Sequence, residues 1–191
     1  MAITGILLAA GRGSRFDPSG ARDKLLQPLT QTSVVAASAQ TLLSVLPRVV
    51  AVVRPGGEAV AAELRALGCD TIVCELADTG MAASLMHAIR HAADADGWIV
   101  ALGDMPHVAP STIQSLKSAL EEGADIAAPV YRGKRGNPVG FGRPHLSRLL
   151  ALEGDQGARG ILRQFPVREV GVDDGGILRD IDTPEDLHRQ G

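Results

Sequence analysis

Cations and glycines near the amino terminus have the types and spacing of a phosphate-binding loop. An apolar run at residues 6–8 leads into Ala9-Ala10-Gly11-Arg12-Gly13-Ser14-Arg15, and Lys24 follows after a Pro/Gly stretch. Small residues let backbone N–H groups approach an anion, and Arg and Lys side chains neutralise its charge. The sequence therefore predicts a loop that binds phosphate. A flexible glycine turn between a strand and a helix is the alternative interpretation.

Two familiar phosphate motifs do not match this loop. The dinucleotide-binding fingerprint needs a third glycine at position 16, which is Phe16. The P-loop needs Gly-Lys-Ser/Thr, whereas Lys24 follows Asp23 and precedes Leu25. Phosphate binding here would therefore use a different kind of loop.

Three aspartates from two distant segments could hold a divalent cation. Asp104 follows an apolar run at residues 98–102, and Asp180 and Asp182 flank Ile181. Side chains alternate along an extended chain, so Asp180 and Asp182 would point to the same side. Carboxylates from separate segments suit Mg²⁺, which also takes phosphate oxygens. A turn or cap role for Asp104 is the alternative, and either Asp180 or Asp182 could be the second ligand.

Histidines and cysteines give no comparable pattern. His87 and His91 are four residues apart on a predicted helix, but no third ligand of matching character stands nearby, so a solvated helix face is favoured over a metal site. No histidine forms a nucleophile-and-base pattern with Ser or Cys, which disfavours hydrolase chemistry. Cys69 and Cys74 have neither zinc nor redox spacing, and we expect them to pack as small apolar residues in a reducing compartment.

Alternating strands and helices position the candidate site residues. Buried strands are predicted at residues 5–8, 49–53, 71–74, 98–102 and 126–130. Helices are predicted at residues 34–46, 58–67, 81–93 and 111–122, followed by short helices at 145–152 and 157–164 and late strands at 168–172 and 177–181. This order predicts an α/β fold with a mostly parallel sheet covered on both faces, and ligands bind at the carboxyl ends of such strands.

Composition narrows the classes of partner. The 191 residues are predicted to form a single domain over residues 1–191. A net charge of -3 and an aromatic content of 3% favour neither nucleic acid nor an anionic membrane as a partner. The sequence has no apolar run of about 18 residues and no basic leader, so we expect a cytoplasmic protein.

Six motifs in order carry a family resemblance that runs nearly end to end. They are Leu-Ala-Ala-Gly-x-Gly-x-Arg with Lys-Leu-Leu, Gly80-Met81-Ala82-Ala83-Ser84-Leu85, Gly103-Asp104-Met105-Pro106, Gly136-Asn137-Pro138-Val139, Gly154-Asp155-Gln156-Gly157-Ala158-Arg159 and Asp180-Ile181-Asp182-Thr183-Pro184. Together they resemble the MobA-like nucleotidyltransferases, and most closely the molybdenum cofactor cytidylyltransferases.

The resemblance implies a Rossmann-like three-layer sandwich with a mixed sheet. It also implies an Mg²⁺-dependent transfer of CMP from CTP to molybdenum cofactor, a molybdopterin phosphate, with release of pyrophosphate. Ala10 favours CTP, because in related enzymes alanine at this position tends to accompany cytidine and glycine guanosine. GTP, or another phosphorylated acceptor such as a sugar phosphate, is the alternative. A non-catalytic nucleotide-binding chaperone for a molybdoenzyme is an alternative of a different class.

The resemblance also assigns roles residue by residue. Arg15 and Lys24 would bind the triphosphate and act in catalysis with Asp104, and Ser84 would help to hold the base. The nucleotide would lie against Ala9, Ala10, Gly11 and Gly13, the metal would bind Asp104 and Asp182, and the acceptor would bind Asn137, Asp155 and Arg159. One departure is the longer segment between Arg15 and Lys24, residues 16–23, so that either Lys24 alone or Arg22 as well could meet the phosphates.

Overall fold

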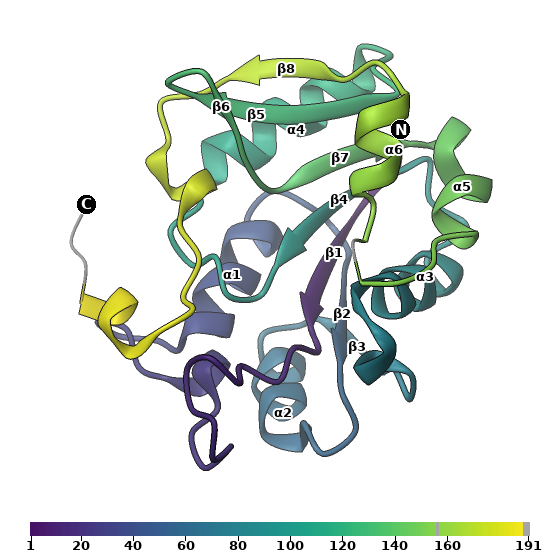
Figure 1. Ribbon diagram of the computed structural model, residues 1–191. Helices are drawn as coiled ribbons and strands as arrows, with labels where there is room; N and C mark the ends of the chain where they lie inside the picture. Colours follow the sequence, from purple (N-terminus) through teal and green to yellow (C-terminus); the bar gives the residue numbers. More distant parts are fainter. Residues whose placement is uncertain (156, 189–191) are drawn as a thin grey trace.

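A mixed sheet forms the centre of the computed structural model, which describes residues 1–155 and 157–188 (Figure 1). Within these residues the sheet has eight strands in the order β3-β2-β1-β4-β7-β5-β6, with β8 beside β5. The strands are β1 Ile3–Ala9, β2 Val49–Val53, β3 Asp70–Val73, β4 Gly97–Leu102, β5 Ile126–Tyr131, β6 Lys134–Arg135, β7 Val139–Gly142 and β8 Arg168–Gly171.

The parallel half of the sheet is centred on β1. This strand pairs in parallel with β2 and with β4, and β3 pairs in parallel with β2. Leu8 lies opposite Val52 in β2 and Leu102 in β4, so the three strands end at the same edge. The Val-Val-Ala-Val-Val sequence of β2 is buried throughout, as expected of a strand covered on both faces. The segments after β1 and β4 therefore leave the sheet side by side.

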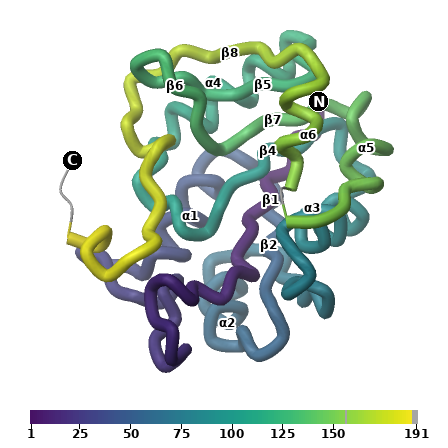
Figure 2. The backbone as a smooth tube through the Cα atoms, in the orientation of Figure 1, coloured from purple at the N-terminus to yellow at the C-terminus, as the bar shows by residue number. Residues whose placement is uncertain are grey.

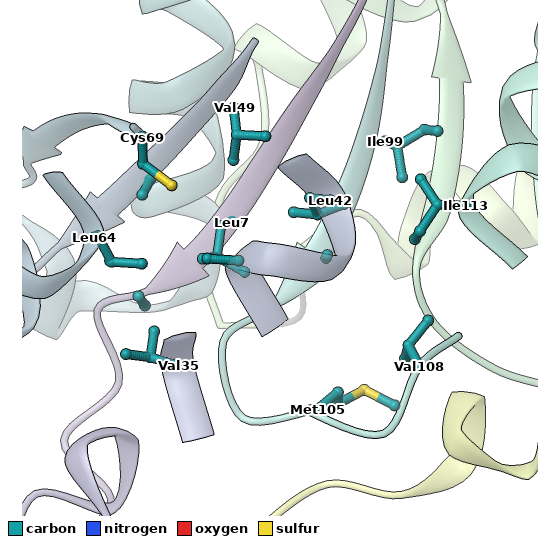
Figure 3. Close-up of a cluster of buried hydrophobic side chains, with 14 of the residues drawn as sticks. Leu7, Val35, Leu42, Val49, Leu64, Cys69, Ile99, Met105, Val108 and Ile113 are labelled. Carbon is teal, nitrogen blue, oxygen red and sulfur yellow. The ribbon is translucent and has the colours of Figure 1, made fainter. Parts of the chain in front are cut away.

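Helices cover both faces of the sheet. They are α1 Val34–Leu43, α2 Glu58–Ala66, α3 Met81–His91, α4 Pro110–Glu121, α5 Leu146–Leu150 and α6 Arg159–Gln164. On one face, Leu7 of β1 belongs to a core with residues of α1, α2 and α4, including Leu42 and Ile113 (Figure 3). On the other, Ile6 belongs to a core with residues of α3, α5 and α6, including Ile89. Successive side chains of β1 thus point into the two cores on opposite faces of the sheet. The predicted Rossmann-like three-layer sandwich is confirmed.

The second half of the sheet departs from the sequence-based prediction. The predicted strand at residues 177–181 is wrong, because the chain forms a 3₁₀ helix, η4 Gly175–Leu178, whose amino end is capped by the Asp174 side chain. Strands β6 and β7 were not predicted. β7 has the sequence Val-Gly-Phe-Gly, and its pairing is antiparallel, with Phe141 opposite Trp98 of β4. Glycine weakens the strand signal, so tertiary pairing decided this element.

The remaining predicted elements are confirmed, with bounds shifted by at most three residues. Helix α6 begins at Arg159 rather than at residue 157, and Gln156, within one predicted motif, lies outside the described residues. In the part of the chain that the structure describes, no helix has the length and apolar character needed to cross a membrane.

The carboxyl-terminal segment crosses back to the edge where β1 and β4 end (Figure 2). After η4 it runs through residues 179–183 to a last 3₁₀ helix, η5 Pro184–His188. The Ile181 amide donates a hydrogen bond of 2.8 Å to the Asp104 carbonyl. Two segments far apart in sequence are therefore held in contact at the sheet edge.

Candidate active site

The loop after β1 folds back on itself and returns the chain to the sheet edge at Lys24. Gly13 has φ +63°, in the left-handed region that favours glycine, and a Cβ there would lie 3.1 Å from the Lys24 Cγ. Phe16 is buried in the core and anchors the loop. The Asp17 carboxylate accepts hydrogen bonds from the Ser19 amide and hydroxyl and from the Arg22 amide. These bonds close the longer segment into a compact turn.

Arg22 and Lys24 leave this turn in different directions. The Arg22 guanidinium lies 5.5 Å from the centre of the Phe16 ring, which is a cation–π arrangement. The Lys24 side chain is only 11% exposed and points to the carboxylates that follow β4 and η4. Of the two cations, Lys24 enters the candidate site.

Lys24 lies between two of the predicted metal ligands. Its Nζ is 2.7 Å from an Asp104 oxygen and 3.4 Å from an Asp182 oxygen. The second Asp182 oxygen is 2.8 Å from Arg15 Nη1, although the Arg15 side chain is 79% exposed. The structure thus brings together Arg15, Lys24, Asp104 and Asp182.

Asp180 completes a cluster of three carboxylates. Ligand oxygens of Asp104, Asp180 and Asp182 lie within 4.8 Å of one another. Partial burial and the negative charge of Asp182 raise the pKa of the Asp180 carboxyl, although the residue as a whole is exposed. Asp180 and Asp182 therefore reach the same side of the chain, as predicted, but from an irregular segment rather than a strand. Hard oxygen ligands at this spacing fit a divalent cation such as Mg²⁺.

Hydrogen bonds donated by backbone amides fix Asp182 beside Asp104. In addition to the Ile181–Asp104 bond, the Asp186 carboxylate accepts hydrogen bonds from the amides of Asp182, at 3.0 Å, and Thr183, at 2.8 Å. Because Thr183 and Pro184 start η5, the acidic residue three positions after Thr183 pins the start of this turn. The cap thereby holds the Asp182 side chain toward Lys24.

A cavity of about 540 Å³ opens from this cluster along the carboxyl edge of the sheet. Lys24 and Asp104 lie at one end, and Ala10 and Gly11 line it at the end of β1. Its other wall comes from the start of α3 and the segments before and beside it, with Ala77, Asp78, Gly80, Met81, Ser84 and Asp155. Its size suits a small-molecule ligand.

Gly80 allows the start of α3 to pack closely against the segment at Gly154 and Asp155. It has φ +130°, and a Cβ at this position would lie 2.5 Å from the Gly154 carbonyl oxygen. The Ala82 amide donates to the same carbonyl at 3.3 Å, which ties the first turn of α3 to the segment that carries Asp155. A side chain at position 80 would push Asp155 away from the cavity.

An ion pair spans the two walls of the cavity. Arg12 Nε donates to an Asp78 carboxylate oxygen at 2.7 Å, and Arg12 Nη2 contacts the second oxygen. The Arg12 hydrogen bond lowers the pKa of the Asp78 carboxyl, and the charge of Arg54 adds to the effect. Arg12 stands within a sequence motif without a predicted role, and no motif marks Asp78 or Arg54. Their contacts, with sequence separations of 31 and 66, had no local signal.

Two of the predicted acceptor residues lie outside this cavity lining. Asn137 lines a separate small pocket beside Leu102 and Met105, and its backbone N–H donates to the Ile177 carbonyl. Arg159 begins α6 and is not among the lining residues, whereas Asp155 is. Ala9 is the buried last residue of β1, Gly13 lies in the loop after it, and neither is among the lining residues. The roles given to these residues stay predictions.

Residues that the sequence analysis set aside have structural partners. His91 Nε2 lies 2.8 Å from an Asp70 carboxylate oxygen on the surface. Cys69 and Cys74 are buried thiols, and burial raises the pKa of Cys69 to about 11. Both observations agree with the structural interpretation of these side chains.

Together, the parallel half of the sheet, the loop after β1 and the acidic cluster define an α/β fold with a cavity and a candidate cation site at the carboxyl ends of its parallel strands. The chain belongs to the MobA-like NTP transferase family, whose model matches residues 5–170.

Two curated relatives illustrate the range of this family. The molybdenum cofactor guanylyltransferase of Cupriavidus pinatubonensis is 31% identical, over 97% of this chain and 94% of the relative. The bifunctional protein GlmU of Bradyrhizobium sp. is also 31% identical, over 87% of this chain. The chain spans only 38% of that GlmU relative, so its resemblance is to one part of a longer protein.

Among solved structures, Rv0371c from Mycobacterium tuberculosis is similar, with a TM-score of 0.86 and 31% identity over 98% of this chain and 97% of that one. A second structure of Rv0371c, with a TM-score of 0.82 and 30% identity over the same shares of the two chains, is a complex with manganese.

Proposed function

We propose that this protein is an Mg²⁺-dependent cytidylyltransferase that transfers CMP from CTP to molybdenum cofactor and releases pyrophosphate. The observation that carries the proposal is the ion-pair contact of Lys24 with Asp104 and Asp182, beside a cavity that Lys24 and Asp104 line together with Ala10 and Ser84. The molybdenum cofactor guanylyltransferase that covers nearly the whole chain supports the choice of acceptor.

The chemistry needs few groups besides these. A phosphate monoester has a second pKa near 6, so at neutral pH the acceptor is mostly a dianion that can attack the α-phosphorus without a general base. An acceptor oxygen forms the new bond to the α-phosphorus, the bond to the bridging oxygen breaks, and pyrophosphate leaves with that oxygen. Lys24 and Arg15 would neutralise the charge on the α-phosphate and on the leaving group.

Asp104 and Asp182 would hold the Mg²⁺, with Asp180 beside them, and the bound ion would stabilise negative charge on the phosphates. The manganese complex of Rv0371c, which is similar to this chain, supports a divalent cation at this site. Ala10 at the end of β1 and the buried Ser84 on the opposite wall would hold the base, and Asp155 would face the acceptor.

GTP as the nucleotide is the second candidate, because the relative from C. pinatubonensis is named a guanylyltransferase. A thermal-shift panel of CTP, GTP, UTP and ATP with Mg²⁺ separates the two. A ligand at about 100 times its dissociation constant adds about 2.7 kcal/mol of stability. We expect selective stabilisation by CTP, whereas a response to GTP alone would overturn the choice of nucleotide.

Turnover is tested by pyrophosphate release with molybdopterin phosphate as acceptor. Asp104→Asn should lower the rate by at least about 10²-fold, comparable to the loss of one preorganised electrostatic group. Asp94→Asn, on an exposed carboxylate paired with Arg48, is the matched control and should leave the rate unchanged. Near wild-type rates in Asp104→Asn would show that the Asp104 carboxylate does not take part in the reaction. Nucleotide binding without pyrophosphate release under any acceptor would instead favour a non-catalytic binding protein.

A further inference from the structure

Arg54 is the first residue after β2 and lies at the same sheet edge as the site. Its guanidinium Nη2 is 3.1 Å from an Asp23 carboxylate oxygen, and the two side chains are 27% and 20% exposed. Asp23 immediately precedes Lys24 in the chain. The ion pair therefore joins the end of a rigid central strand to the residue next to the buried lysine.

Hydrogen bonds to the side chain and the backbone of Asp23 fix the chain on either side of Lys24. Its second carboxylate oxygen accepts the Leu25 amide at 3.0 Å, which caps the 3₁₀ helix η1 Lys24–Leu26. Its carbonyl accepts the Gln27 side-chain amide at 2.9 Å. The Gln27 backbone amide also donates to the Lys24 carbonyl. The backbone of Lys24 is thus fixed on both sides.

This arrangement differs from an ordinary surface ion pair. Exposed pairs contribute little because solvent screens them and both side chains lose rotamer freedom. Here both side chains are partly buried, and Asp23 uses one oxygen for Arg54 and the other for the cap that begins at Lys24.

We propose that Arg54 is a positioning residue for nucleotide binding, acting through Asp23 to hold Lys24 at the phosphate end of the cavity. This inference rests on the proposed function, since it assumes that Lys24 binds the triphosphate. Arg54 is not among the residues that line the cavity, so it would act on the nucleotide through its neighbours rather than by contact. Its effect should therefore disappear when Lys24 is removed.

A double-mutant cycle on nucleotide affinity tests this dependence. The dissociation constants of CTP, GTP, UTP and ATP with Mg²⁺ are measured by calorimetry on the full chain, and the tightest nucleotide is used for the variants. We expect Arg54→Met to weaken binding by up to about tenfold, because a lysine that is no longer held in place must be ordered when the nucleotide binds. Lys24→Met should weaken it about 10- to 100-fold. The double variant should match Lys24→Met within about twofold, because coupled residues are not additive.

Arg48→Met is the matched control. Arg48 precedes the same strand at its opposite end and pairs with Asp70 and Asp94, so its loss changes the net charge equally but away from the site. The Arg48→Met variant should bind the nucleotide with the same affinity as the wild type. The melting temperature of each variant without ligand separates a general loss of stability from a loss of positioning.

A second cycle needs no change at Lys24. Asp23→Asn keeps an acceptor for the Leu25 amide but removes the charge that faces Arg54. Asp23→Asn, Arg54→Met and their combination should weaken nucleotide binding equally. Additive losses in either cycle, or wild-type affinity in Arg54→Met, would overturn the role of Arg54 while leaving the proposed function intact. If the wild type binds none of the four nucleotides, the proposed function itself is wrong, and the role of Arg54 falls with it.

Discussion

Substitution of Lys24 by methionine removes the ammonium that lies between Asp104 and Asp182 but keeps an unbranched stem to pack on Gly13. Without a bound cation, this ammonium neutralises part of the charge of three carboxylates. A divalent cation at the same oxygens must therefore displace it. We expect Lys24→Met to bind Mn²⁺ more tightly than the wild type does, although the variant loses nucleotide affinity.

The magnitude follows from the geometry. A unit charge pair at about 4 Å interacts by about 4 kcal/mol at an effective dielectric constant near 20. The pairs at 2.7 and 3.4 Å involve carboxylates that are 20% and 24% exposed, so solvent screens part of this attraction. Desolvation of the ammonium offsets a further part. A net effect of about 1.4 to 2.8 kcal/mol corresponds to Mn²⁺ affinity that is about 10- to 100-fold higher.

The assay is a titration with Mn²⁺ alone, followed by the paramagnetic resonance signal of the free ion. Lys117→Met is the control, because Lys117 pairs with Glu121 on the surface of α4 and should leave the affinity unchanged. Metal-free Lys24→Met should also melt at a lower temperature than the wild type and regain stability when Mn²⁺ is added. Equal or weaker Mn²⁺ binding in Lys24→Met would show that the lysine and the metal do not share these carboxylates.

Three further predictions concern individual side chains. The pKa of the Asp180 carboxyl is raised in the fold, so the folded protein loses stability as the pH rises and this carboxyl ionises. Asp180→Asn should therefore raise the metal-free melting temperature at pH 7. A gain in melting temperature that does not shrink as the pH falls toward 3.8 would contradict this. The buried Asp174 carboxylate accepts bonds from Ala109 N, Thr112 Oγ1 and Gly176 N, so Asp174→Ala should cost about 2 to 4 kcal/mol in urea unfolding, with its exposed neighbour Asp173→Ala as an unaffected control. With a pKa of about 11 and 6% exposure, Cys69 should resist alkylation at pH 8 in the folded protein and react in urea, as followed by intact mass.

Much of the site could be predicted because its residues stand next to strong local signals. Gly11 and Asp104 directly follow apolar runs that form central parallel strands, and the carboxyl ends of such strands meet at one edge. Lys24 could be predicted from its residue type, although its distance along the chain from the loop glycines departs from the family pattern. The compact turn closed by Asp17 explains how the longer segment still delivers Lys24 to that edge.

Other parts of the site had no local signal. Arg54 follows a strand without any motif, and its relevance comes from a contact with Asp23 that spans 31 positions. Residues 177–181 resembled a strand by alternation, yet the Asp174 cap and the Asn137–Ile177 hydrogen bond hold them out of the sheet. Asp180 and Asp182 nevertheless share one side, because the contact between Ile181 and Asp104 orients them.

The sequence by itself determined the alternation of strands and helices, the two-sided burial of the central strands and the family, because these depend on periodicity and motifs within short windows. Only the tertiary structure decided that the Lys24 ammonium pairs with the carboxylates of both Asp104 and Asp182. It also decided that Arg54 pairs with Asp23, the residue before Lys24. The physical reason is the range of the interactions. Secondary structure depends on the order of residues within a short stretch of chain. The energy of a charge depends on its distance to other charges and on its exposure to water, and both are set only when the chain folds.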